Sequence, residues 1–283
     1  MAIQSNSLRG ALWMLGAIAS FTAMAIAARA LLRHMGSFEV VFWRGVWMLL
    51  IVLALVPGSG GFASLRTHRF ALHVKRNAAH FIGQTAWVFA LSALPLATVF
   101  AIEFTMPVWT VILAALMLGE RITPPRIVML VLGLAGVLII LRPGLSVIHP
   151  AALVMLLGSL ALAAQFIFTK QLSASEKPLT IIFWMCIIQM PLGLAGSVPA
   201  WVWPVAADVP WMGLMGVASY TAHYCITRAV KSADASVVVP IDFIRLPVVA
   251  VIGVLFYGEA FDPLVLAGAA LIFAGTTYSL RRP

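Results

Sequence analysis

Apolar runs, each about as long as a membrane-crossing helix, follow one another along the whole chain. A helix needs about 20 mainly apolar residues to cross the hydrocarbon core of a bilayer. Charged, glycine or proline residues interrupt the runs, for example at residues 57–61, 142–144 and 231–234. We expect the first run to be an uncleaved helix, because it is long for a signal peptide and more spans follow. The pattern predicts ten transmembrane helices, near residues 8–28, 38–56, 74–94, 97–118, 126–141, 149–169, 178–199, 209–229, 235–257 and 263–280.

Lys and Arg residues are distributed unevenly between the two sides of this arrangement. If the N-terminus is cytoplasmic, thirteen of the 18 fall on the cytoplasmic side: Arg9, Arg66, Arg69, Lys75, Arg76, Arg121, Arg126, Lys170, Lys177, Arg228, Lys231, Arg281 and Arg282. Three fall on the opposite side: Arg29, Arg33 and Arg142. Cytoplasmic loops of membrane proteins are enriched in Lys and Arg. We therefore expect a multi-pass protein of the cell membrane with both termini in the cytoplasm.

The second half of the chain repeats the first. A shift of 139 residues places Ile102-Glu103-Phe104 on Ile241-Asp242-Phe243, and Gly119-Glu120 on Gly258-Glu259. Each half holds five predicted helices, and an odd number of spans forces the second copy to enter the membrane in the opposite direction. The prediction is an all-α membrane protein whose ten transmembrane helices form two inverted five-helix repeats, residues 1–145 and 146–283.

The composition excludes a soluble fold. Hydrophobic residues make up 63% of the chain and charged residues 10%, whereas soluble domains average about 45–50% and about 25%. The net charge of +9 is explained by basic loops, and no run of more than two Lys or Arg residues suggests nucleic-acid binding. Cys186 and Cys225 lack the spacing of a metal site or redox motif.

These features resemble the drug/metabolite transporter superfamily, and its EamA-type members in particular. The resemblance rests on the five-plus-five duplication, the FWRG stretch at residues 42–45, the two Gly-Glu pairs, and Gly-rich last helices ending in Arg142 and Arg281. It covers nearly the whole chain. It implies transport of a metabolite such as an amino acid, a nucleotide-derived compound or a vitamin, often outward. The second half has Met185 where the first has Arg44, so a basic role there is not duplicated.

Four charged residues fall well inside predicted spans: Arg44, Glu103, Asp242 and Arg245. Charges inside a bilayer are costly, so each is a candidate for function, although a salt bridge that locks helices together is the alternative. Asp242 and Arg245 share a helix face because they are three residues apart. We expect Arg245 to pair with Asp242, and Arg44 with Glu103. Met106 occupies the position after Glu103 that matches Arg245, so Asp242 is expected to stay ionised and Glu103 to be the freer of the two to take up a proton.

Polar and aromatic residues at helical spacing form a second group of candidates. His80 and Gln84 lie one turn apart, and the 139-residue shift places Gln84 on His223, near Tyr220. They predict either a cavity lining or hydrogen bonds between helices. Trp43 and Trp184 match across the repeat and either stack on a substrate or pack. The candidate substrate-binding or coupling residues are Glu103, Asp242, Arg245, Arg44, Gln84, His223, Trp43, Trp184, Tyr220 and His80.

Residues at helix breaks and ends add two expectations. Pro107 and Pro247 lie in the two carboxylate helices and predict bends, which serve either as hinges or as static kinks. Glu120 and Glu259 sit beside glycines at helix ends, where a solvated interfacial position is expected.

No catalytic or nucleotide-binding motif of the GxSxG, HExxH or Walker type occurs in the sequence. The chain is therefore expected to be a secondary transporter of small metabolites such as amino acids or related amphipathic compounds. We expect alternating access, with coupling to protons or sodium open. The alternatives are a membrane-embedded enzyme acting on lipids or isoprenoids, and a channel. No cofactor or metal is expected; the expected partners are a small-molecule substrate, the bilayer and protons, in a monomer or a homodimer.

Overall fold

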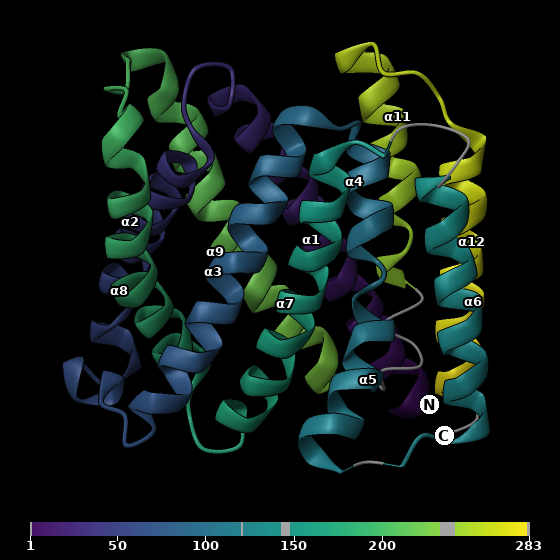
Figure 1. Ribbon diagram of the computed structural model, residues 1–283. Helices are drawn as coiled ribbons and strands as arrows, with labels where there is room; N and C mark the ends of the chain where they lie inside the picture. Colours follow the sequence, from purple (N-terminus) through teal and green to yellow (C-terminus); the bar gives the residue numbers. More distant parts are fainter. Residues whose placement is uncertain (1, 120, 143–147, 233–240, 282–283) are drawn as a thin grey trace.

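The computed structural model describes residues 2–119, 121–142, 148–232 and 241–281, and within these ranges it contains helices and no strand. The long helices of the first half are α1 (Ala2–Leu31), α2 (Ser37–Leu55), α3 (Phe70–Ala93), α4 (Leu96–Glu103), α5 (Met106–Leu118) and α6 (Pro124–Leu141). Those of the second half are α7 (Pro150–Ser173), α8 (Pro178–Ser197), α9 (Val209–Ser232), α11 (Arg245–Tyr257) and α12 (Pro263–Arg281) (Figure 1). Short 3₁₀ helices occupy Pro57–Ser59, Phe62–Leu65, Val198–Ala200 and Ala206–Asp208.

Eight of the ten predicted helices correspond to one helix each, with ends displaced by a few residues. The predicted helix 97–118 differs, because it is divided into α4 and α5. Of the predicted helix 235–257, residues 235–240 lie outside the described part of the chain, and α11 begins only at Arg245. Glu120 and Arg282 also lie outside the described part of the chain.

Seven helical segments of the described chain are long and apolar enough to cross a membrane: Leu8–Leu31, Ser37–Leu55, Leu96–Met117, Pro124–Leu141, Pro150–Ser173, Pro178–Ala200 and Pro263–Arg281. The helices α3 and α9 have the length to cross, at 24 residues each, but they carry more polar side chains. Many of these polar groups are buried, including His73, Asn77 and Ser219. The two most polar long helices therefore use their polar faces inside the protein.

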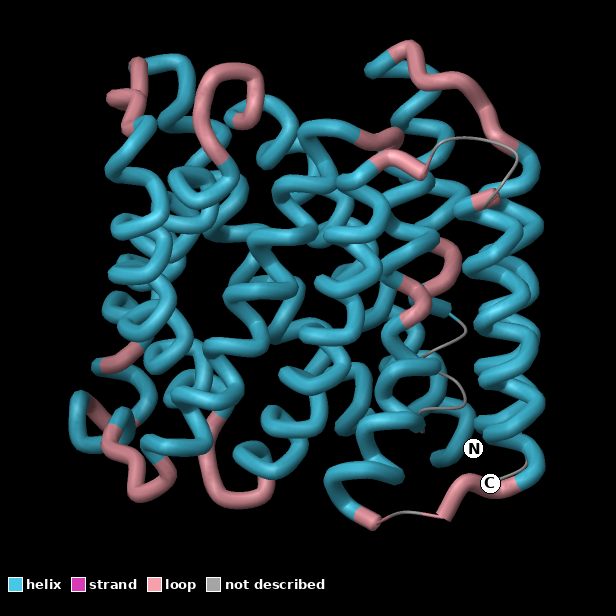
Figure 2. The backbone as a smooth tube through the Cα atoms, viewed as in Figure 1, coloured by secondary structure: helices cyan, strands magenta, loops and turns pink. Residues whose placement is uncertain are grey.

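Helix pairs from opposite halves of the chain pack side by side. The most extensive contacts join α1 to α9, α3 to α7, α2 to α8 and α6 to α12. In Figure 1, α2 and α8 form one edge of the bundle and α6 and α12 the other. Most loops gather at the two ends of the bundle (Figure 2), and both termini lie at the same end. The two halves are thus interleaved rather than separate.

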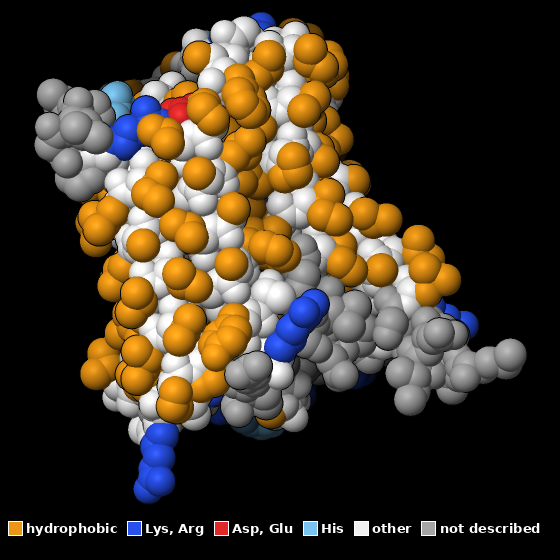
Figure 3. All heavy atoms as spheres, turned by 90° about the vertical axis from the view of Figure 1, so that its right-hand side faces the viewer, with side chains coloured by type: hydrophobic (Ala, Val, Ile, Leu, Met, Phe, Trp, Pro, Cys, Tyr) orange, Lys and Arg blue, Asp and Glu red, His pale blue; other side chains and the backbone are white. Residues whose placement is uncertain are grey.

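The α6–α12 pair is held at close range by glycines. A Cβ atom added at Gly136 would lie 2.4 Å from the carbonyl oxygen of Gly268, and one added at Gly268 would lie 2.6 Å from that of Gly136. The outer side of this pair is apolar, with exposed Ile127, Val131 and Leu138 on α6. Figure 3 shows hydrophobic side chains along the height of this face. Such a surface suits contact with lipid.

Candidate functional site: two buried polar clusters

Two helices break at matched positions. After α4 ends at Glu103, residues 104–105 form a turn before α5, and the Thr105 N–H donates to the Ile102 carbonyl at 3.0 Å. Residues 243–244 form the equivalent turn before α11, where the Ile244 N–H donates to the Ile241 carbonyl, also at 3.0 Å. These two bonds are related by the 139-residue shift. In Figure 1 the break between α4 and α5 lies part-way along the bundle.

Proline explains why each second segment starts where it does. Pro107 lies in the first turn of α5, and Pro247 is the third residue of α11. Proline cannot donate a backbone hydrogen bond, so it interrupts a continuing helix but is tolerated in a first turn. The bends predicted at these prolines are present as two-residue turns between consecutive helices. Each α5 and α11 segment ends at a glycine with a left-handed backbone, Gly119 at φ 67° and Gly258 at φ 64°, a conformation that suits glycine.

The breaks bring together what we call the charge cluster: Glu103, Asp242, Arg245 and Trp87. The Arg245 Nη2 atom donates to Glu103 Oε1 at 3.1 Å and to Asp242 Oδ2 at 3.3 Å. Trp87 Nε1 donates to Glu103 Oε2 at 2.8 Å. The side chain of Arg245 is 3% exposed, that of Glu103 16% and that of Asp242 25%.

The charge cluster corrects one sequence-based expectation. The expected pair of Asp242 and Arg245 is present, but Glu103 pairs with Arg245 rather than with Arg44, because the break directs the α4 carboxylate toward α11. Glu103 accepts from two donors in the described structure, Arg245 and Trp87. Asp242 accepts from one, and its Oδ1 atom is buried without a partner in the described structure.

Phenylalanines surround the charge cluster. The Arg245 guanidinium lies 4.5 Å from the ring centre of Phe21 and 5.0 Å from those of Phe100 and Phe104. Phe104 and Phe243, the two break residues, stack on each other with ring centres 4.3 Å apart and planes at 16°. The sequence reasoning did not select these rings, although the repeated Ile-acid-Phe triplets contain both stacked members.

The second buried group, which we call the arginine cluster, consists of Arg44, Arg76, Asn77, His80 and Gln189. Arg44 Nη2 donates to Gln189 Oε1 at 3.2 Å, and Arg76 Nη1 donates to Asn77 Oδ1 at 2.8 Å. The Gln189 amide connects the two arginines, since its Nε2 donates to Asn77 Oδ1 at 3.1 Å. His80 Nδ1 lies 3.0 Å from the same Nε2. The cluster joins α2, α3 and α8.

The sequence reasoning counted Arg76 with the basic residues of the cytoplasmic side, at the start of the predicted helix 74–94, and did not select it as a candidate site residue. Helix α3 begins at Phe70, so Arg76 lies further inside the helix than predicted, and it is 2% exposed. Its spacing of four residues from His80, and eight from Gln84, was the signal that would have placed it on their face.

The remaining predicted residues lie around these clusters but do not form one cavity with them. His80 and His223 face each other with ring centres 5.9 Å apart, and Tyr220 stacks on Tyr224. Gln84 is buried, and its Nε2 has no partner in the described structure. Trp43 packs on Phe42 and Trp201.

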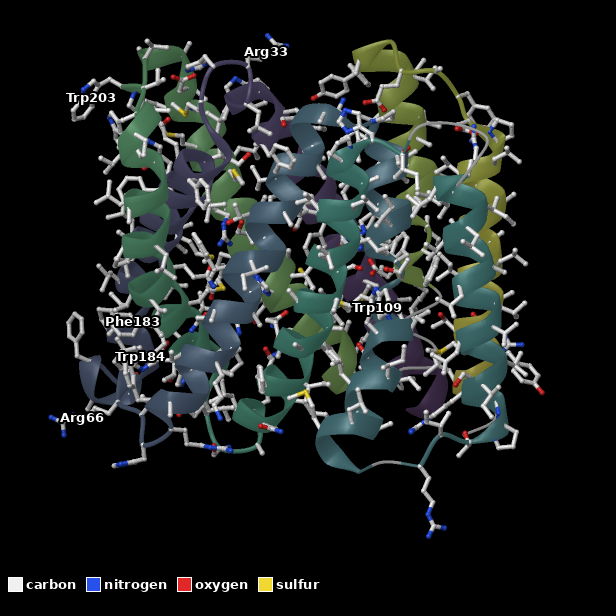
Figure 4. The ribbon with its side chains drawn as sticks, in the orientation of Figure 1. Arg33, Arg66, Trp109, Phe183, Trp184 and Trp203 are labelled. Atoms are coloured by element: carbon white, nitrogen blue, oxygen red, sulfur yellow. The ribbon has the colours of Figure 1, made fainter. Side chains whose placement is uncertain are left out.

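Trp184 is not brought together with Trp43. Its Nε1 atom donates to the Leu65 carbonyl at 3.0 Å. In Figure 4, Trp184 lies toward the end of the bundle that carries Arg66, whereas Arg33 points outward at the opposite end.

Ion pairs at the end that carries Arg33 tie helix termini together. Glu259 pairs with Arg29 and accepts from the Leu96 N–H at 2.8 Å, which caps the start of α4. Arg29 also donates to the carbonyls of Leu91 and Leu94, at the end of α3. Glu259 is 12% exposed, so the expectation of a solvated position was wrong. Arg142 pairs with Asp262 before α12.

Cavities near these groups are small. One of about 140 Å³ lies between α4, α11 and α12 beside Glu259, and one of about 90 Å³ lies beside Arg76 and His223. The charge cluster lines neither of them. Sites for drug-sized molecules occupy about 300–1,000 Å³, so neither of these two cavities is large enough to hold such a molecule in the described conformation.

Comparisons with known proteins give a consistent result. The EamA-like transporter family matches residues 8–142 and again residues 149–281. A riboflavin transporter of Rhizobium johnstonii is 33% identical over 98% of this chain and 92% of its own length. An S-adenosylmethionine uptake transporter of Rickettsia bellii is 26% identical over 94% of this chain and 91% of its own. A solved crystal structure superposes with a TM-score of 0.67 at 18% identity, covering 95% of both chains, and supports the fold.

Proposed function

The chain belongs to the EamA-like transporter family, and from that premise we propose that it is a secondary transporter that carries a ring-bearing metabolite by alternating access. As a family member it is a multi-pass membrane protein that transports a small metabolite, and it is not an enzyme. The observation that carries the proposal is the charge cluster at two matched helix breaks. Broken helices with charged groups at their ends are how many secondary transporters build a substrate site.

We further propose ten spans in two inverted repeats, residues 1–145 and 146–283, with both termini cytoplasmic. The double match of the family supports this division. So do the contacts, because α1 packs on α9 as α7 packs on α3, and these pairs are equivalent under a five-helix repeat. Arg66 and Arg33 lie at opposite ends of the bundle (Figure 4), as expected if the end that carries Arg66 is cytoplasmic.

For the substrate we propose riboflavin, because a relative of 33% identity bears that name and because the cluster combines flat rings with hydrogen-bonding groups. Separation of the stacked Phe104 and Phe243 would open a slot for a planar ring. Glu103, Asp242 and Arg245 would then bind the polar substituents, with Gln84 and Tyr220 as further lining. The ring stack and the charges come from both halves, so the substrate would be held between the repeats.

S-adenosylmethionine is a second candidate. Two carboxylates and one arginine leave the charge cluster with an excess of negative charge, which favours a cation, and a more distant relative is named for this substrate. Riboflavin is uncharged at neutral pH, so it gains nothing from that excess. The two substrates can be separated directly by flux.

Access requires an opening of the end where Arg29 and Glu259 meet. This pair joins α1 to the segment after α11 and holds the start of α4. We propose that its release separates α4 and α11 from α1 and exposes the charge cluster. Protonation of a cluster carboxylate would weaken its bond to Arg245, and this is the proposed route of proton coupling.

The test is flux into proteoliposomes that contain the purified protein. Labelled riboflavin and labelled S-adenosylmethionine are each measured with and without a pH gradient, for the wild type, Glu103→Gln and Asp242→Asn. Arg33→Gln, an exposed charge change, is the control. We expect riboflavin flux in the wild type and the control, and its loss in both cluster variants. Normal flux with an unchanged pH profile in both variants would show that the carboxylates are structural only.

A further inference from the structure

Arg44 and Arg76 are buried inside the protein, and no carboxylate of the described residues pairs with either of them. They are 1% and 2% exposed. Within the described residues they donate only to neutral groups, Gln189 for Arg44, and Asn77 and Thr169 for Arg76. By contrast, Arg29, Arg142 and Arg245 each bond to a carboxylate.

Burying a charge without a partner costs several kcal/mol even after the protein relaxes. Two such charges joined through Gln189 and Asn77 also repel each other. A bound anion would remove both costs, because a guanidinium is a planar donor that matches the oxygens of phosphate and carboxylate groups. The cluster also holds spare donors, since Arg44 Nε and Asn77 Nδ2 are buried and have no partner in the described structure.

We infer that the arginine cluster is a binding site for an oxyanion, a phosphate or carboxylate group, held by Arg44 and Arg76. Gln189, Asn77 and His80 orient the two guanidiniums. This site is distinct from the charge cluster and does not depend on riboflavin being the transported substrate. An anionic group bound here belongs either to an organic metabolite or to a free ion.

The cavity of about 90 Å³ provides the approach to this site. Arg76 lines it together with Thr169, His223 and Thr227. Glu176 lines it as well, and in the described structure its carboxylate oxygens accept from Thr67 and His73 rather than from Arg76. The volume exceeds what one water needs and is below that of a drug-sized site. It fits a group of a few atoms.

The test measures binding of inorganic phosphate to the purified wild-type protein by calorimetry, in chloride buffer. Arg44→Gln/Arg76→Gln is the test variant, and Arg66→Gln, an exposed arginine at the same end, is the control. We expect phosphate to bind the wild type and Arg66→Gln alike, and the double variant at least about tenfold more weakly. No binding to the wild type, or equal binding to the double variant, would overturn the inference.

A second measurement needs no variant and therefore does not depend on how the variants fold. Phenylglyoxal modifies arginines, and mass spectrometry reports the extent at each peptide. Phosphate should slow modification of Arg44 and Arg76 but not of Arg66; equal rates with and without phosphate would contradict the site. Calorimetry with phenyl phosphate then identifies whether the bound oxyanion belongs to an organic metabolite or is a free ion. Tighter binding than inorganic phosphate assigns the site to an organic metabolite, and equal binding assigns it to the free ion; both results support the site.

Discussion

The charge cluster and the arginine cluster place equally buried arginines in opposite electrostatic surroundings. Arg245 is 3% exposed and bonds to two carboxylates. Arg44 and Arg76 are as deeply buried, yet all their bonding partners in the described structure are neutral. The first cluster pairs its arginine with carboxylates of the protein, although Asp242 Oδ1 and the Nε and Nη1 atoms of Arg245 are buried without a hydrogen-bond partner in the described structure. The second offers its arginines no carboxylate among the described residues, which is why we propose that it binds an anion.

The largest loss of stability is expected when the charge cluster loses its arginine. Arg245→Gln leaves Glu103 and Asp242 close together without their shared donor, and breaking such a buried pair costs about 3–5 kcal/mol. Thermal unfolding of the purified protein should show a large drop in midpoint relative to Arg33→Gln. Adding Asp242→Asn to Arg245→Gln should restore part of the loss. An unchanged midpoint for Arg245→Gln would mean that the two carboxylates do not depend on Arg245.

The next effect separates the two acids of the charge cluster. Among the described residues, Glu103 accepts from Arg245 and Trp87, whereas Asp242 accepts from Arg245 alone. Hydrogen bonds to charged groups contribute about 1.5–3 kcal/mol each, so Glu103→Gln should destabilise the protein more than Asp242→Asn. Thermal unfolding of the two variants in the same detergent measures the order. The reverse order would contradict the arrangement of donors described above.

A smaller change in stability is expected at Arg44, which pairs with no carboxylate of the described residues. Arg44→Met removes an unpaired buried charge and keeps much of the side-chain volume, so the gain in desolvation offsets the lost bond to Gln189. In phosphate-free buffer the variant should be at most about 1 kcal/mol less stable than the wild type, the size of one neutral hydrogen bond, and it should be more stable where the relief of desolvation exceeds that loss. Chemical or thermal unfolding checks this. A loss as large as that of Arg245→Gln would show that Arg44 has an anionic partner within the protein itself.

The smallest effect belongs to an ion pair outside the bundle core. Burial raises the pKa of Asp262, but hydrogen bonds from Arg142 and the Leu264 N–H lower it by more, so its pKa is below the ordinary value. The carboxylate therefore adds stability at neutral pH, which is lost as the pH falls through the lowered pKa. The pair is partly exposed, so Asp262→Asn should cost no more than about 1 kcal/mol at pH 7. Unfolding of the variant and the wild type should converge in strong acid, and a difference that persists there would assign the effect to another cause.

Much of the architecture was predictable because it depends on local pattern. Apolar runs of about 20 residues predicted eight helices within a few residues, and the repeated triplets around Glu103 and Asp242 predicted that their surroundings would match. The resemblance to EamA-type transporters, based on residues 42–45 and the two Gly-Glu pairs, is confirmed by the family match. The helix break was only partly predictable. Pro107 indicated a bend, but the end of α4 at Glu103 depends on packing against α11.

By itself, the sequence determined that this chain is a helical membrane protein with a duplicated pattern, because hydrophobic length and spacing are properties of consecutive residues. It also determined that Asp242 and Arg245 share a face, since three residues make nearly one helical turn. Only the tertiary structure decided which charges meet. Arg245 reaches Glu103 across 142 positions of the chain, and Arg44 and Arg76 meet through Gln189, because helices from opposite halves pack side by side. Such pairings depend on how helices are placed in space, and no periodicity along one helix contains that information.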